Sequence, residues 1–365
     1  MVPGVTILPG KGALGQCFRV VAVYTGTVIG AGFASGQEIL QFFIVFGSRG
    51  LWGAVLATVL FGLLGLFLMK LVMTLRTTSY AQLLPPLMGH RLAGLVDLLS
   101  LAMLPGGLAV MLAGSGAVFQ EQFGLAPAGG VMLAAIITAL VILFGLEGVL
   151  LANMILVPVK LLAIGLVCLF ALLLHGISLP SGEQLVRPVT GFPHWAWFSL
   201  LYVSYNLVVP VAVLSSLGRS LEKRPAVLGG LVGGLVLGAT AGLITLAGLA
   251  HYPQITGYQV PILLLAGFLG ETWRHALGGL IWLAIITTAI ADAHGFASRL
   301  APGGGWRYRA VGLATIICAL PLAKMDFSRL VQLLYPLFGY AGLIILVALL
   351  LAPFRLKWIT RCQIF

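Results

Sequence analysis

Residues 24–43 read YTGTVIGAGFASGQEILQFF, an apolar run with three glycines among the seven residues from Gly30 to Gly36. In a lipid bilayer, such a run would form a helix that is interrupted near its middle. The interruption frees backbone N–H and C=O groups, which lipid cannot satisfy but a solute or an ion can. The stretch therefore predicts a broken membrane-spanning helix with a binding site at the break.

The composition of the chain supports placing this run in a membrane. Of the 365 residues, 60% are hydrophobic and 8% are charged, whereas soluble domains have about 45–50% apolar and about 25% charged residues. These values exclude a soluble globular protein and a disordered chain. The net charge of +11 does not indicate a nucleic-acid partner, because the basic residues are scattered between apolar runs instead of sharing one solvated face.

Ten apolar stretches are long enough to cross a hydrocarbon core of about 30 Å at about 1.5 Å per residue. We expect membrane helices over residues 17–46, 51–75, 92–122, 129–145, 149–175, 194–218, 226–250, 272–299, 308–323 and 327–353. The segment Gln259 to Gly270 is too short for a span and is expected to be interfacial or re-entrant. The sequence thus predicts one all-α membrane domain over residues 1–365, with tails at 1–16 and 354–365.

Basic residues predict the orientation. Ten spans put both ends of the chain on one side, and placing that side in the cytoplasm leaves fourteen Lys and Arg residues inside. Only five fall outside, namely Arg49, Arg187, Arg274, Lys324 and Arg329. Because basic residues favour the cytoplasmic side, we expect a multi-pass protein of the cell (inner or plasma) membrane with both termini cytoplasmic.

The ten spans divide into halves of nearly equal length, 17–175 and 194–353, which would be inverted repeats of five helices each. The second half also opens with an interrupted span, at Ser204-Tyr205-Asn206, with Pro210 four residues on. Paired interruptions of this kind are typical of secondary transporters and mark the substrate site. We therefore expect helices 1 and 6 to be broken at mid-membrane, with a solute bound by Gly30, Ala31, Gly32, Phe33, Ala34, Ser35, Gly36, Tyr205 and Asn206.

One other interpretation of the first break, and two interpretations of Glu38, stay open. Gly26–Gly30 and Gly32–Gly36 both have the small-xxx-small spacing of close helix packing. Ser35 to Glu38 matches the Ser-x-x-Glu capping box, which would mark a helix that restarts inside the membrane. Glu38 is then either a cap or a group that carries a proton or binds an amine.

The stretch from Tyr24 to Phe43 resembles the opening helix of the YkvI-type bacterial membrane proteins, within the amino acid–polyamine–organocation (APC) transporter superfamily. The ten-span count extends the resemblance over essentially the whole chain, and it implies the LeuT-type fold and a transport role. In that fold, hydroxyl residues on the eighth helix help to bind sodium, and in some relatives a lysine on the fifth helix replaces the ion. This chain is similar on both counts, with Thr287 and Thr288 in the eighth span and Lys160 in the fifth, so proton and sodium coupling both stay open.

Charged residues at membrane depth are costly and are functional candidates. Lys160 lies about 17 Å into the fifth span by helix rise, so it needs a carboxylate partner or must favour its uncharged form. Pro158, two residues earlier, would free a backbone carbonyl that could hold the ammonium. Asp292 follows Thr288 by one turn on the same helix face and is the expected partner. Lys160, Thr287, Thr288, Asp292 and Glu38 are thus the predicted coupling groups, with sodium at Thr287 and Thr288 as the one metal ion considered.

Together these patterns predict a secondary transporter of a small amine or amino-acid-like solute, coupled to H⁺ or Na⁺ and using no other cofactor. A ligand receptor without net transport is the alternative. An enzyme is not expected, because the chain has no HExxH motif and Gly114-Ser115-Gly116 has Ala113 where GxSxG needs glycine.

Overall fold

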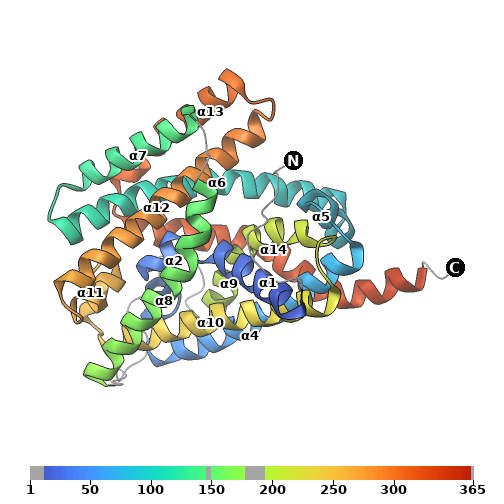
Figure 1. The fold of residues 1–365 in the computed structure, drawn as a ribbon, viewed down its shortest axis with the longest axis horizontal. Helices are drawn as coiled ribbons and strands as arrows, with labels where there is room; N and C mark the ends of the chain where they lie inside the picture. Colours follow the sequence, from blue (N-terminus) through green and yellow to red (C-terminus); the bar gives the residue numbers. More distant parts are fainter. Residues whose placement is uncertain (1–11, 145–148, 177–193, 363–365) are drawn as a thin grey trace.

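The computed structural model describes residues 12–144, 149–176 and 194–362. Most of the predicted N-terminal tail, the last three residues of the C-terminal tail and nearly all of the linker between the predicted halves lie outside the described residues. The described part of the chain contains helices and no strand (Figure 1). Its α-helices are α1 Ala13–Val28, α2 Ala31–Ser35, α3 Gln37–Phe42, α4 Ser48–Leu75, α5 Tyr80–Met88, α6 His90–Phe123, α7 Pro127–Phe144, α8 Val149–His175, α9 Trp195–Leu214, α10 Lys223–Ala250, α11 Pro261–Gly267, α12 Glu271–Leu300, α13 Gly305–Ala319 and α14 Phe327–Cys362. Short 3₁₀ helices lie at Ile44–Phe46, Ser215–Leu217, Gln254–Gly257 and Leu322–Lys324.

The prediction of an all-α polytopic membrane protein is confirmed. Eight helices of the described residues are long and apolar enough to cross a membrane, namely α4, α6, α7, α8, α9, α10, α12 and α14. The first predicted span is divided among α1, α2 and α3, and the ninth corresponds to α13, which has 15 residues. The count of ten spans therefore stays a prediction, as do the division into inverted repeats and the cytoplasmic placement of the termini.

The predicted break in the sixth span is wrong for this structure, since α9 is continuous through Ser204, Tyr205 and Asn206. Two of the polar side chains that suggested a break bond to backbone carbonyls instead. The Ser204 hydroxyl donates to Leu201 over 2.8 Å and to Gly339 of α14 over 2.6 Å, while the Asn206 amide donates to Tyr202 over 3.0 Å. The helix is therefore continuous through all three residues, although Pro210 has no N–H to donate to the Asn206 carbonyl.

Glycines hold α4 and α10 together, the two helices that are second in each predicted half. A Cβ atom added to Gly234 of α10 would overlap the carbonyl of Phe61 on α4, and one added to Gly65 of α4 would overlap the carbonyl of Gly230. Such contact between backbones is the usual packing of membrane helices, because lipid supplies no hydrophobic force between them.

We expect Gly234→Ala to lower the thermal unfolding temperature of the purified protein, because the methyl group must push α4 and α10 apart, at about 1–3 kcal/mol. Gly242→Ala is the matched control on the same helix, since a Cβ there meets no atom within 4 Å. Equal unfolding temperatures for the two variants would contradict this description of the interface.

Candidate functional site

The first membrane span is interrupted twice. α1 ends at Val28, and Ile29 turns the chain with φ −76° and ψ 72°, so that the Gly30 amide donates to the Val28 carbonyl over 2.7 Å. α2 then runs to Ser35, and Gly36 takes the left-handed φ of +81° before α3 begins. The broken first helix is confirmed, and its two interruptions lie at the ends of the predicted stretch from Gly30 to Gly36, because Ala31–Ser35 between them form a helical turn.

The predicted capping box is also wrong. The Ser35 hydroxyl donates to the carbonyl of Gly32 over 2.8 Å, and it accepts from the Gln37 amide over 3.3 Å. α3 is preceded by Gly36 and has no side-chain cap. The left-handed turn at Gly36 puts Ser35 at the end of one helix instead of at the start of the next, so the Glu38 carboxyl is not used as a cap.

Lys160 of α8 contacts the first interruption. Its ammonium donates to the carbonyl of Ile29 over 3.1 Å, and the side chain is 1% exposed. The turn at Ile29 makes this carbonyl available, since Ile29 caps the end of α1, where the last carbonyls have no partner within the helix. The Lys160 charge is thus met by a backbone dipole created by the break, which is the contact that a bound cation would make.

Thr288 of α12 lies on the other side of the same break. A Cβ atom on Gly30 would be 3.9 Å from the Thr288 hydroxyl. Thr287 and Thr288 both donate to the Ala284 carbonyl, over 3.0 and 2.8 Å, which is the ordinary bonding of threonine in a helix. Their oxygens keep lone pairs that can accept a proton donor or contact a cation.

Glu38 of α3 reaches back over α2. Its carboxylate accepts a hydrogen bond from the Tyr205 hydroxyl of α9, and a Cβ added to Gly32 would overlap it. The residue is 4% exposed, so this carboxyl is buried at membrane depth. We call Ile29, Glu38, Lys160, Tyr205 and Thr288 the break site, because each lies against one of the two interruptions or the turn between them.

Aromatic rings surround the Glu38 carboxyl. Tyr205 has ring centroids of Phe42, Tyr202 and Tyr335 at 5.7, 5.7 and 5.1 Å. The Tyr335 hydroxyl of α14 would be 2.9 Å from a Cβ on Gly32. The Tyr202 hydroxyl is buried and has no hydrogen-bond partner among the described residues. A buried carboxyl with aromatic faces and a free hydroxyl is suited to an organic cation.

Two predicted site residues lie elsewhere. Asn206 bonds to its own helix, as described above, and Asp292 does not pair with Lys160. Asp292 lies instead against α6, where a Cβ on Gly107 would be 2.7 Å from its carboxylate. The one-turn spacing from Thr288 is real, but it turns Asp292 toward α6, while α8 brings Lys160 to the break from another side.

Substitutions at Gly30 and Gly32 provide a matched comparison. Gly32→Ala is expected to abolish ligand binding, because the new methyl group takes the space of the Glu38 carboxyl and the Tyr335 hydroxyl. Gly30→Ala should keep it, because its methyl group meets only the Thr288 hydroxyl at 3.9 Å and the Val28 carbonyl at 4.0 Å. Binding would be followed as ligand-dependent thermal stabilisation, and equal loss in both variants would contradict the geometry.

The comparison with curated sequences decides the family. The chain is 31% identical to the protein YyaD of Bacillus subtilis (strain 168) over 340 residues, covering 91% of this chain and 96% of that protein. It is 28% identical to the membrane protein YkvI of the same organism, covering 92% and 96%. The chain belongs to the YkvI family. No protein-family model matches it.

Solved structures similar to this member of the YkvI family have the LeuT-type fold of secondary transporters. The inward-facing conformation of Mhp1 has a TM-score of 0.59 at 15% identity, over 89% of this chain and 73% of Mhp1. MhsT in complex with L-phenylalanine has a TM-score of 0.61 at 15% identity, over 89% and 87%. A manganese transporter of Eremococcus coleocola has a TM-score of 0.57 at 14% identity, over 92% and 78%. The neighbours are transporters and not enzymes, in agreement with the sequence prediction.

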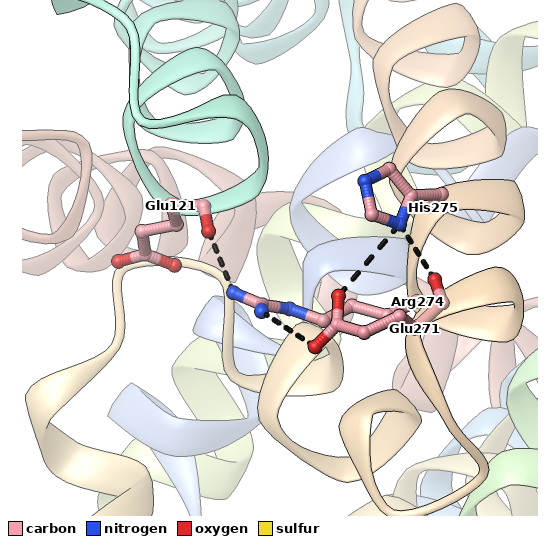
Figure 2. A network of polar contacts seen from close by, with 4 residues as sticks. All are labelled: Glu121, Glu271, Arg274 and His275. Carbon is pink, nitrogen blue, oxygen red and sulfur yellow. Dashed lines mark hydrogen bonds and ion pairs between the residues drawn. The ribbon is translucent and has the colours of Figure 1, made fainter.

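A polar network at one end of the bundle was not predicted (Figure 2). The Glu121 carboxylate of α6 accepts from the amides of Gln259 and Val260, over 2.5 and 3.0 Å, just before α11. Arg274 of α12 donates to the Glu121 carbonyl over 2.7 Å and forms an ion pair with Glu271 at 3.5 Å. These bonds attach the start of α11 to α6 and α12.

The attached helix α11 covers the second interruption of the first span. A Cβ on Gly36 would be 2.9 Å from the Ile262 side chain and 3.3 Å from that of Pro261. In the YkvI-family chain described here, the short segment predicted from Gln259 to Gly270 is therefore a short helix that lies over the break. Neither Glu121 nor Tyr335 carried a sequence signal, because a carboxylate near a helix end and a tyrosine in an apolar helix are both common.

Proposed function

We propose that this chain is an ion-coupled secondary transporter of a small amine-bearing solute that works by alternating access. The observation that carries the proposal is the buried Glu38 carboxyl at the break of the first span, bonded by Tyr205 and surrounded by aromatic rings. A carboxyl at this depth is expensive unless a cation or a proton compensates it. The transporter part is supported by the LeuT-type fold.

The charge at the break favours the amine end of the solute. The helical turn after Gly30 is short, and Gly32 within this turn lies against the Glu38 carboxyl. An anionic group placed there would be repelled by Glu38, whereas an ammonium group would be attracted by the carboxylate and by the tyrosine faces. MhsT was solved in complex with L-phenylalanine, a solute with an amine and an aromatic ring, and such molecules belong in the first set of solutes to test.

The coupling role is assigned to Lys160. Its ammonium lies where a coupling cation would contact the Ile29 carbonyl, with Thr288 across the break. Loss of the Lys160 proton would remove the positive charge beside that carbonyl and weaken the hydrogen bond between them, which would change the free energy of the broken helix in one facing state more than in the other. We therefore favour proton coupling through Lys160, while sodium at Thr287 and Thr288 is the competing assignment. Asp292 stays a candidate for a second protonation site.

The test is a ligand screen on the purified protein, followed by thermal unfolding. Primary amines and amino acids, including L-phenylalanine, would be compared with their N-acetylated counterparts, which carry an uncharged amide in place of the ammonium group. We expect the amines to stabilise the protein and the N-acetylated compounds to have no effect. Equal stabilisation by both sets would contradict recognition by Glu38.

A ligand receptor without net transport is the second candidate. It shares the ligand site, so the screen does not separate the two functions. Uptake into liposomes separates them, since a receptor shifts its conformation on binding but accumulates nothing.

A further inference from the structure

Three rings meet at the end of the bundle where α8, α10 and α11 lie close together (Figure 1). His175 ends α8, His251 follows α10, and Phe268 follows α11. The two imidazole centroids are 4.8 Å apart, and Phe268 is 4.4 Å from His175 and 4.7 Å from His251. The break-site residues are not part of this cluster, so the proposed function leaves it unexplained.

The tautomer of the neutral His251 ring follows from its bonding. Its Nδ1 atom lies 2.8 Å from the Ala247 carbonyl oxygen. A carbonyl oxygen can only accept, so Nδ1 carries the hydrogen, and Nε2 of the neutral ring is left with a lone pair. This Nε2 atom is buried and has no hydrogen-bond partner among the described residues, and His251 is 6% exposed. A buried acceptor without a partner costs free energy, and so calls for an explanation.

This arrangement is the one that metal-binding histidines use. Such a histidine donates its remaining ring N–H to a carbonyl or a carboxylate, which fixes the tautomer and directs the other nitrogen at the metal. Two imidazoles sharing a tetrahedral zinc ion, with Zn–N bonds of about 2.0–2.1 Å, have ring centroids about 5 Å apart. The observed centroid separation of 4.8 Å, at an interplanar angle of 75°, is close to that value.

His175 provides the second imidazole of the pair. His175 is exposed, so a metal ion can reach the two rings from solvent and keep water molecules on its free positions. The two histidines of α12, in contrast, already have partners. His294 lies 2.7 Å from the Tyr308 hydroxyl, and His275 lies 2.6 Å from the Glu271 carbonyl. Among the described residues, the unpaired buried imidazole nitrogen is therefore particular to His251.

We propose that His175 and His251 form a binding site for a divalent transition-metal ion of the zinc class. Imidazole ligands suit Zn²⁺, Cu²⁺ and Ni²⁺. The described residues offer no third His, Cys, Asp or Glu side chain to this pair, so the site has two protein ligands and binds the ion reversibly.

Metal binding would affect the helix that covers the break. A bound ion fixes the ends of α8 and α10 against Phe268, which follows α11, and α11 packs on Gly36. Holding these three ends together restricts any movement of α11 away from the break. Zn²⁺ is therefore expected to slow transport. This consequence rests on the proposed function, whereas the metal site itself does not.

The experiment is a titration of the full-length, tag-free protein in detergent with Zn²⁺ by calorimetry and with Co²⁺ by visible absorption. We expect one saturable site, and a loss of affinity of at least about tenfold in His175→Phe and in His251→Phe, which keep an aromatic ring but remove the ligand nitrogens. His275→Phe is the control at the same end of the molecule and should bind like the wild type. No saturable binding by the wild type, or unchanged binding by His251→Phe, would overturn the proposal.

A second measurement needs no variant and so does not depend on how the variants fold. Acylation of histidines by diethyl pyrocarbonate, read by mass spectrometry, should be slowed by Zn²⁺ at His175 and unchanged at His275. Equal reaction at His175 with and without the ion would also overturn the metal site. Both measurements are made without a solute, so a failure of the proposed transport activity would leave their outcome unaffected.

Discussion

Lys160→Met is expected to abolish gradient-driven accumulation of the solute while exchange of labelled for unlabelled solute continues. The methionine keeps most of the side-chain volume but removes the ammonium that donates to the Ile29 carbonyl over 3.1 Å. Without the Lys160 ammonium, which is the proposed proton carrier of the coupling, an imposed pH gradient no longer favours one facing state. We expect the accumulation ratio in liposomes to fall by about tenfold or more, equivalent to about 1.4 kcal/mol of lost coupling.

The matched control for this prediction is Lys70→Met, which removes an exposed lysine from the membrane helix α4. It should accumulate solute like the wild type. Thermal unfolding of both variants would show that neither has lost its fold. Full accumulation by Lys160→Met under a pH gradient would show that the coupling role is assigned to the wrong residue, and a remaining dependence on sodium would transfer it to Thr287 and Thr288.

Glu38→Gln is expected to weaken binding of the amine solute by about 100-fold, or about 3 kcal/mol. Glutamine has nearly the same shape, but it cannot pair with an ammonium group in a site where the carboxylate is 4% exposed. Removing one partner of a buried charge pair typically costs about 2–5 kcal/mol. Binding would be measured by calorimetry with the strongest ligand from the screen.

The control here is Glu271→Gln, because the Glu271 side chain is 71% exposed and takes no part in the break site. It should bind the ligand with wild-type affinity. Tyr205→Phe provides a graded comparison, since it removes the hydroxyl that bonds to Glu38 and leaves the ring. Wild-type affinity in Glu38→Gln would mean that the solute is held somewhere else.

The sequence predicted the membrane helices well, because each span is a long apolar run and eight of them are continuous helices. It also located the first break correctly, since glycines in such a run are a strong local signal. It failed at Ser204-Tyr205-Asn206, where polar residues suggested a break but Ser204 and Asn206 bond to carbonyls of α9 and α14, and Tyr205 bonds to Glu38 of α3. Whether a polar residue breaks a helix or bonds to it depends on its neighbours in space, which local sequence does not contain.

The candidate site was predicted only in part, because it too depends on contacts between distant segments of the chain. Lys160 could be identified because a lysine at membrane depth needs a partner, and its partner proved to be the carbonyl freed by the break. Its pairing with Asp292 was wrong, since helix periodicity fixes a face but not the helix that this face meets. Tyr335 and Glu121 depend on contacts between segments more than 130 residues apart in the chain, namely α14 or the start of α11 with the first half.

The most direct test of transport is the concentration ratio of the amine solute across liposomes that contain the purified protein, under a pH gradient and, separately, under a sodium gradient. We predict that the solute accumulates above its equilibrium level under an inward proton gradient and that the accumulation collapses when an ionophore removes the gradient. If ligands stabilise the protein but no solute accumulates under either gradient, the chain is a receptor, and the proposed transport is contradicted.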